Sequence, residues 1–126
     1  MSAPRVLLAN EPLSYRDALV AVLGSLRPLA EVWAVEAAAL ERETRRLAPH
    51  LVVCSRLVPA VEEVGVAAWV ELYPDHGALS RVCVRGEHRT VGDMQLRDLL
   101  CLVDEAQRIS ADQHVLSACM SAGRPH

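Results

Sequence analysis

Leu51-Val52-Val53-Cys54 is the most strand-like run in the chain, and the polar residues Ser55 and Arg56 follow it directly. The run shows no helical spacing, which is typical of a strand buried on both faces. Pro49 separates it from an Ala-rich, charged stretch at residues 36–47, whose composition favours a helix. The sequence therefore predicts a helix followed by a buried strand in this part of the chain.

The preceding residues predict two further strands and one further helix. Residues 5–10 form a short apolar run that ends in polar residues, and residues 31–35 are compatible with a second strand. Between them, apolar side chains recur on one helix face, with Ser14 as the expected cap and Pro28 as the stop. The order strand, helix, strand, helix, strand implies a parallel sheet with right-handed crossovers. The apolar face consists of Tyr15, Ala18, Leu19, Val22, Leu23 and Leu26.

Beyond the third strand the pattern is less regular. Residues 59–64 predict one or two helical turns ended by Gly65, and residues 67–72 predict a fourth strand. Residues 81–91 predict a strand, a tight turn at Gly86-Glu87 and a return strand. This part of the chain is therefore expected to form a hairpin at a sheet edge.

The last predicted helix covers residues 93–109, with Asp93 as its cap. Residues 110–126 keep no sustained period, so we expect them to form a flexible or weakly ordered tail. Residues 1–109 are expected to form a single α/β domain, because 126 residues leave little room for a second one.

Composition excludes several classes of partner. The 13 basic residues are all arginines against 16 acidic residues, so a formal charge of -3 argues against nucleic-acid binding. No segment approaches the ~18 apolar residues of a membrane span, so no membrane partner is expected. The four cysteines form no C-x-x-C pair, and Cys54 is expected to be an inert core thiol in a reducing cytoplasm. The histidine spacings match no metal motif, so we expect no metal and no cofactor.

Three stretches together resemble the first half of a response-regulator receiver domain: residues 5–13, the helix at 15–26, and Leu47 to Ser55 with its internal proline. The match in order and spacing covers residues 4–57, and the second half matches only loosely. The resemblance implies an open, mainly parallel, three-layer sheet of the flavodoxin or receiver type. Residues 73–80 are too few for the family's fourth helix, so a short turn or hairpin is expected there.

The resemblance also implies a pocket, and this chain departs from its chemistry. The family's two acidic residues fall at Asn10 and Glu11, and its phospho-acceptor aspartate falls at Ser55. The family's lysine falls near Arg85, and the chain contains no lysine. One carboxylate with an amide and a hydroxyl is a poor ligand set for Mg²⁺. We therefore expect a degenerate receiver pocket without catalytic residues, in a protein that is not an enzyme.

By resemblance, the leading hypothesis is a regulatory or signalling protein that acts independently of phosphorylation, through protein–protein interaction or dimerisation. Receiver domains use the face from the fourth strand to the fifth helix for dimers and effectors, and that region is rebuilt here as a hairpin. An exposed strand edge is available to another chain. The expected interaction surface consists of Arg81, Val82, Val84, Arg85, Arg89 and Val91.

The alternative is a small-molecule or anion binder, with an enzyme as the less favoured form. Ligands of open α/β sheets collect at the carboxyl ends of the strands. Asn10, Glu11, Ser55 and Arg56 follow two such strands, and Arg56 would contact an anionic ligand.

Overall fold

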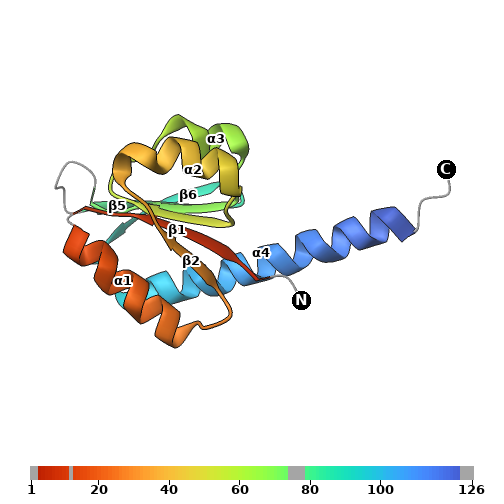
Figure 1. The fold of residues 1–126 in the computed structure, drawn as a ribbon, viewed down its shortest axis with the longest axis horizontal. Helices are drawn as coiled ribbons and strands as arrows, with labels where there is room; N and C mark the ends of the chain where they lie inside the picture. Colours follow the sequence, from red (N-terminus) through yellow and green to blue (C-terminus); the bar gives the residue numbers. More distant parts are fainter. Residues whose placement is uncertain (1–2, 12, 74–78, 123–126) are drawn as a thin grey trace.

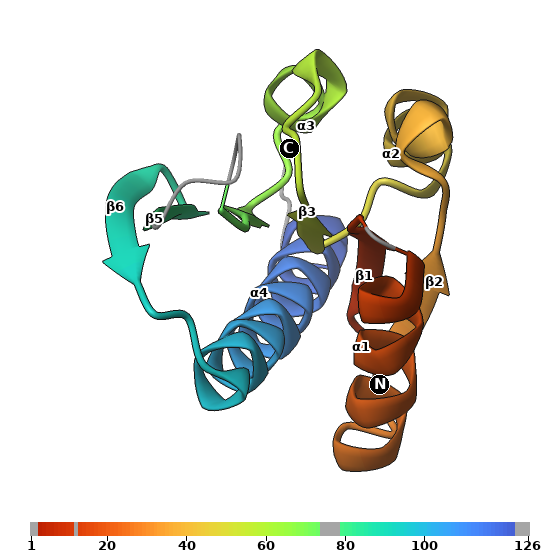
Figure 2. The same ribbon diagram turned by 90° about the vertical axis from the view of Figure 1, so that its left-hand side faces the viewer.

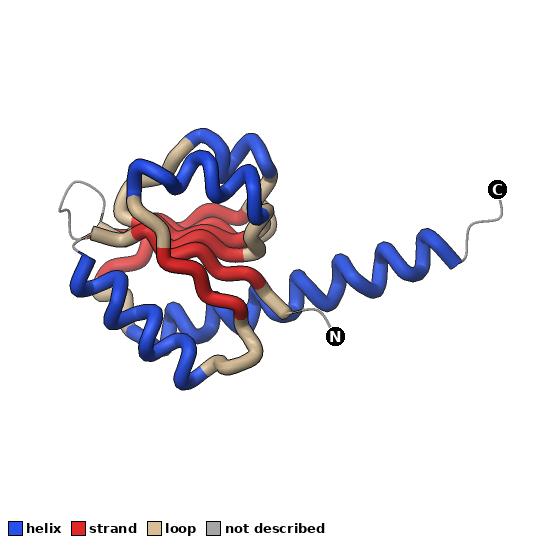
Figure 3. Tube along the Cα trace, in the orientation of Figure 1, coloured by secondary structure: helices blue, strands red, loops and turns tan. Residues whose placement is uncertain are grey.

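A computed structural model describes residues 3–11, 13–73 and 79–122, with side chains up to residue 112. In this part of the chain the strands form one six-stranded sheet, in the order β2-β1-β3-β4-β5-β6 (Figure 1). Helices pack on both of its faces (Figure 3). In chain order the elements are β1 (Arg5–Ala9), α1 (Leu13–Leu26), β2 (Glu31–Ala34), the short 3₁₀ helix η1 (Ala37–Ala39), α2 (Leu40–Leu47), β3 (Leu51–Cys54), α3 (Pro59–Val64), β4 (Ala68–Glu71), β5 (Leu79–Val84), β6 (Glu87–Gly92) and α4 (Leu96–Ala122).

The prediction of a mainly parallel, flavodoxin-like or receiver-like sheet is wrong. Strands β2, β1, β3 and β4 run parallel, but β4 pairs with β5 and β5 with β6 in antiparallel orientation. The physical reason is the short connection between β4 and β5. Strand β4 ends at Glu71, and β5 already begins at Leu79. A parallel pair needs a crossover of about a dozen residues or more, so the chain must turn back here. The sheet is therefore mixed, with an antiparallel half at one side.

The predicted hairpin is confirmed. Strands β5 and β6 pair in an uninterrupted register from Leu79 opposite Gly92 to Val84 opposite Glu87, and β6 is the last strand of the sheet. The turn lies at Arg85-Gly86, one residue earlier than predicted. Both residues have positive φ, 51° and 87°, which is typical of the type I′ turn that joins two-residue hairpins.

The core lies on both faces of the sheet. Helices α2 and α3 cover one face, and α1 and α4 cover the other (Figure 2). Because side chains of a strand alternate between faces, the continuous apolar runs of β1 and β3 contribute to both cores. On the α1 and α4 side the core includes Val6, Leu8, Val53 and Val70 with Leu23 and Leu102; on the α2 and α3 side it includes Leu7, Val52 and Trp69 with Leu40 and Val61.

Two of the predicted helix starts are wrong. Helix α1 begins at Leu13, so Ser14 lies inside its first turn, and α4 begins at Leu96, beyond Asp93. At α4 the carboxylate of Asp98 accepts a hydrogen bond of 2.8 Å from the backbone N–H of Gln95. An acidic side chain therefore satisfies an N–H group at this helix start from within the first turn.

Helix α4 is longer than predicted. It continues past residue 109, through the segment expected to be a weakly ordered tail, as far as Ala122, and extends beyond the sheet (Figure 1). Residues 110–122 contain neither glycine nor proline and include several strong helix formers. Helix propensity can form a helix here without the apolar stripe on which the prediction depended. The carboxylate of Asp104 on α4 accepts two hydrogen bonds from Arg27, at 2.7 and 3.1 Å, and so ties α4 to the end of α1.

We predict that Leu102→Ala lowers the free energy of unfolding by about 2–5 kcal/mol, because it leaves a cavity between α4 and the sheet. Leu102 is 4% exposed, whereas Leu96, in the first turn of the same helix, is 41% exposed. Leu96→Ala is the matched control and should cost about 1 kcal/mol or less. Urea unfolding followed by circular dichroism measures both, and equal losses would contradict the described packing of α4.

Candidate functional site

The carboxyl ends of β1 and β3 bring two predicted site residues together. Ala9 and Cys54, the last residues of these neighbouring strands, lie opposite each other. Asn10 and Ser55 follow them directly, so they lie at the same edge of the sheet, as the sequence predicts. Strand β1 lies between β2 and β3, and chain connections leave this point in opposite directions, which is where open α/β sheets bind ligands.

The hydroxyl of Ser55 is occupied by a structural contact. The backbone N–H of Glu11 donates to the Oγ of Ser55 at 2.9 Å, and this hydroxyl donates to the carbonyl oxygen of Glu11 at 3.4 Å. The side chain thereby joins the end of β3 to the segment that follows β1. Ser55 therefore holds the segment after β1 against the end of β3.

Asn10 is the unusual group at this edge. Its side chain is 1% exposed, yet neither Nδ2 nor Oδ1 has a hydrogen-bond partner among the described residues. A buried amide without partners costs about 1–3 kcal/mol. Asn10 therefore has a free hydrogen-bond donor and acceptor among the described residues, whereas the hydroxyl of Ser55 is already bonded to Glu11.

Glu11 and Arg56 are both exposed at the same end of the sheet. In the part of the chain that the structure describes, neither side chain takes part in an ion pair. They are therefore available to solvent beside the buried Asn10.

The placement of Arg85 in this pocket is wrong. Because β5 runs antiparallel to β4, its last residue lies opposite Ala68, the first residue of β4. The backbone N–H of Arg85 donates to the carbonyl oxygen of Ala67 at 2.7 Å, and its guanidinium pairs with Asp112 of α4 at 2.8 Å. Arg85 therefore lies at the opposite edge of the sheet from Asn10 and Ser55.

Glu71 is a residue of the carboxyl edge that the sequence analysis missed. Its carboxylate is buried, and it accepts hydrogen bonds from the Nε of Arg81 at 2.8 Å and from the backbone N–H of Leu57 at 2.7 Å. The guanidinium of Arg81 also lies 5.8 Å from the ring centroid of Trp69. Glu71 thus ties the loop after β3 to the first residues of the hairpin. The signal was an acidic residue ending an apolar strand, but its partner becomes evident only once the direction of β5 is known.

One residue of the predicted interaction surface is not on the surface. Val82 is 1% exposed and belongs to the core on the α1 and α4 side. Its strand, β5, lies between β4 and β6, so the edge that remains is that of β6. The remaining predicted residues reach the surface to different degrees: Arg81, Arg85 and Arg89 are exposed, and Val84 and Val91 are half-buried.

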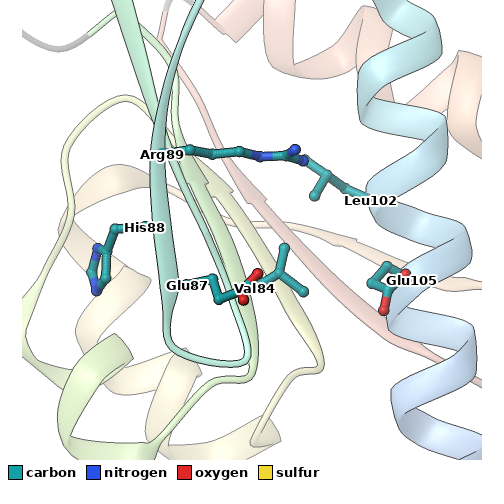
Figure 4. A pocket seen from close by; sticks show the side chains of 6 residues that line it. All are labelled: Val84, Glu87, His88, Arg89, Leu102 and Glu105. Atoms are coloured by element: carbon teal, nitrogen blue, oxygen red, sulfur yellow. The ribbon is translucent and has the colours of Figure 1, made fainter.

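A groove of about 620 Å³ lies between β6 and α4. Figure 4 shows Arg89 extending from β6 toward Leu102 on α4, while His88 points to the other side of the strand. His88 contacts the ring of Trp69 edge-on, at 5.7 Å between centroids. The groove is lined by two aliphatic residues and four polar or charged ones: Val84, Leu102, Glu87, His88, Arg89 and Glu105.

The thiol of Cys54 is buried, as predicted for an inert core cysteine. Burial, followed by the nearby carboxylate of Glu71, raises the pKa of Cys54 to about 12. Thiol reactivity depends on the thiolate, which is scarce at neutral pH when the pKa is this high. Cys54 therefore carries little thiolate at neutral pH and packs as a core side chain.

Comparison with protein-family models, with curated proteins and with solved structures finds no match for this chain. Among the described helices, none is long and apolar enough to cross a membrane. Histidine, cysteine and acidic side chains in the described ranges form no cluster of three or more that would hold a metal ion.

We predict that Asn10→Leu stabilises the protein by about 1 kcal/mol, because it replaces an unpaired buried amide with an apolar group of similar size. Asn10→Ala is the control, since it removes the amide but leaves a cavity, and it should be less stable than Asn10→Leu. Thermal and urea unfolding measure both variants. A loss of stability in Asn10→Leu larger than in Asn10→Ala would show that the amide is bonded in solution.

We also predict that acetyl phosphate with Mg²⁺ transfers no phosphoryl group to the chain. By the receiver resemblance, Asn10 supplies an amide where that family has a carboxylate that holds the cation. The Ser55 hydroxyl is bonded to the backbone of Glu11. Intact mass spectrometry after incubation should show the unmodified mass, with a complete receiver domain as the positive control. A stoichiometric gain of one phosphoryl group would contradict this assignment of the strand ends.

Proposed function

We propose that this chain is a regulatory or signalling module that acts by protein–protein interaction, independently of phosphorylation, and that β6 is the strand that receives its partner. The observation that carries the proposal is the free edge of β6. It is the last strand of the sheet, and of its residues only Val91 is half-buried while the others are exposed (Figure 2). A free edge of this kind can be extended by a strand of another protein.

The hydrogen-bond pattern of the hairpin identifies the backbone groups available at this edge. The N–H of Arg85 bonds to the carbonyl of Ala67 on the β4 side, so alternate residues of β5 bond to β4. The residues between them, beginning with Val84 opposite Glu87, bond to β6. On β6 the inward-bonding residues are therefore Glu87, Arg89 and Val91, and the backbone groups of His88, Thr90 and Gly92 point outward.

Strand β6 has none of the backbone features that usually protect an edge. It contains no proline, and its register with β5 runs without a bulge from Glu87 to Gly92. Natural sheets commonly use proline, bulges or a covering helix to block further pairing. A regular edge that no described strand or helix covers therefore supports a role in strand addition.

The organisation of the carboxyl edge supports a role without phosphotransfer. Asn10 replaces a carboxylate, Ser55 holds the backbone of Glu11, and Arg85 lies at the far edge of the sheet. The resemblance to the first half of receiver domains accords with a regulatory protein that has lost the reaction and kept the interaction.

A second candidate function, binding of a small polar ligand at the carboxyl edge, is favoured by one observation. Asn10 is buried with both of its polar side-chain atoms unpaired among the described residues. A buried group that lowers stability is often retained for function. In this hypothesis the amide recognises the ligand, and the exposed Glu11 and Arg56 follow the same two strand ends.

We predict that Thr90→Pro abolishes partner binding while the chain remains folded. Proline removes the outward N–H of Thr90 and leaves the bonds between β5 and β6 intact, because proline is tolerated where a strand faces solvent. Thr90→Ser keeps the N–H and is the matched control. Affinity capture with tagged chain from extracts of the native cell should recover the same partner, a second copy included, with wild type and Thr90→Ser only.

Circular dichroism must show that Thr90→Pro retains the wild-type fold. Undiminished binding by folded Thr90→Pro would contradict the assignment of β6 as the interaction edge.

A further inference from the structure

We propose that the partner of β6 is a second copy of this chain, paired antiparallel about a two-fold axis that passes beside Thr90. This inference rests on the proposed function, namely that β6 receives a strand. It adds the identity of that strand and its register. A symmetric dimer of this kind joins two sheets at their β6 edges into one continuous sheet and leaves no β6 edge free.

The outward backbone groups determine the register. His88, Thr90 and Gly92 are evenly spaced, and Thr90 is the middle one. If the axis lies at Thr90, His88 faces the partner's Gly92, Thr90 faces the partner's Thr90, and Gly92 faces the partner's His88. All three facing pairs then exchange both of their backbone hydrogen bonds. Any shifted antiparallel register has fewer hydrogen-bonded pairs.

Side chains exclude a shift toward the turn. An axis at Arg89 would place Arg89 directly opposite the partner's Arg89, with Cα atoms about 4.5 Å apart, and like charges in that position destabilise a pair. With the axis at Thr90, Arg89 lies opposite the partner's Val91, whose methyl groups can pack against the arginine stem. Thr90 then faces a second threonine, a pairing that stabilises antiparallel strands.

The backbone excludes a shift in the other direction. An axis at Val91 would place Arg89 opposite the partner's Asp93, so Asp93 would have to continue the strand. The φ of Asp93 is 49°, which is left-handed and incompatible with extended pairing. Strand β6 ends at Gly92, so the register centred on Thr90 pairs residues 88–92 of the two copies and leaves Glu87 beyond the last pair.

The surroundings of β6 leave room for a second copy. In the sheet order β6 has a neighbour on one side, and no described helix lies beyond its free edge in Figure 2. The groove on the α4 side lies beneath the same strand and is flanked by Glu87, Glu105 and Arg89. A two-fold axis perpendicular to the sheet keeps both α4 helices on the same face of the joined sheet.

Cysteines introduced on β6 test the register, with the buried Cys54 and Cys83 left in place. In a background with Cys101→Ser and Cys119→Ser, the variants Arg89→Cys, Thr90→Cys and Val91→Cys each place one thiol at one of the three candidate axes. Facing residues in a hydrogen-bonded pair have Cα atoms about 5.5 Å apart, within the reach of a disulfide. We expect mild oxidation to produce a covalent dimer in Thr90→Cys. Preferential cross-linking of Arg89→Cys or Val91→Cys would overturn the register.

The oligomeric state of the unmodified chain tests the partner. We expect light scattering across a concentration series to show a dimer for wild type. Thr90→Pro should raise the dissociation constant about 30-fold or more, because both N–H donors at the axis are lost.

A wild-type chain that stays monomeric at high concentration would overturn the second copy as the partner. If Thr90→Pro then still abolished capture of another protein, the proposed function would stand and this inference alone would fall. If Thr90→Pro changed neither dimerisation nor capture, both would fall.

Discussion

The connection between β4 and β5 is too short to hold a crossover helix, and the positions of the main functional features depend on this constraint. After Glu71 the chain must turn back, so β5 begins at the carboxyl edge of the parallel strands and ends at the opposite edge. Arg81 is thereby placed beside Glu71, whereas Arg85 is carried away from Ser55. The hairpin also makes β6 the outermost strand, with its backbone groups uncovered.

The two regions that could carry function differ in how much of their polar capacity is already used. At the carboxyl edge, the side chain of Ser55 accepts a hydrogen bond from a backbone N–H, and that of Glu71 accepts from a backbone N–H and from Arg81. The side-chain amide of Asn10 has no partner among the described residues. At β6, alternate backbone groups face outward along a whole strand. Strand pairing uses many equivalent groups at once, whereas a single buried amide can specify only a small ligand. For this reason we place the interaction role at β6 and ligand binding second.

The pattern of apolar residues in the sequence predicts the elements of the parallel half. Strands β1 and β3 are recognisable because strands buried on both faces consist of nearly uninterrupted apolar residues. The sequence also predicts the hairpin, whose turn chemistry is local. It does not predict the direction of β5, which depends on which neighbour that strand meets. Two errors follow from that single gap: the parallel sheet and the position of Arg85. The burial of Val82 follows instead from the place of β5 between β4 and β6. The unpaired state of Asn10 is likewise a property of its three-dimensional surroundings, and residue type alone cannot show it.

The hairpin has a consequence for the order of folding. Its first pair, Val84 with Glu87, joins residues that are close in sequence, whereas the pair of Leu7 with Val52 on the parallel side closes a long loop. Hairpins form in about 1–10 µs, and long-range pairs form later because loop closure costs entropy. Local pairing thus favours formation of the hairpin before the parallel half encloses its core. If β6 receives a second copy as proposed, two chains on one polysome could meet at this edge before either has finished folding.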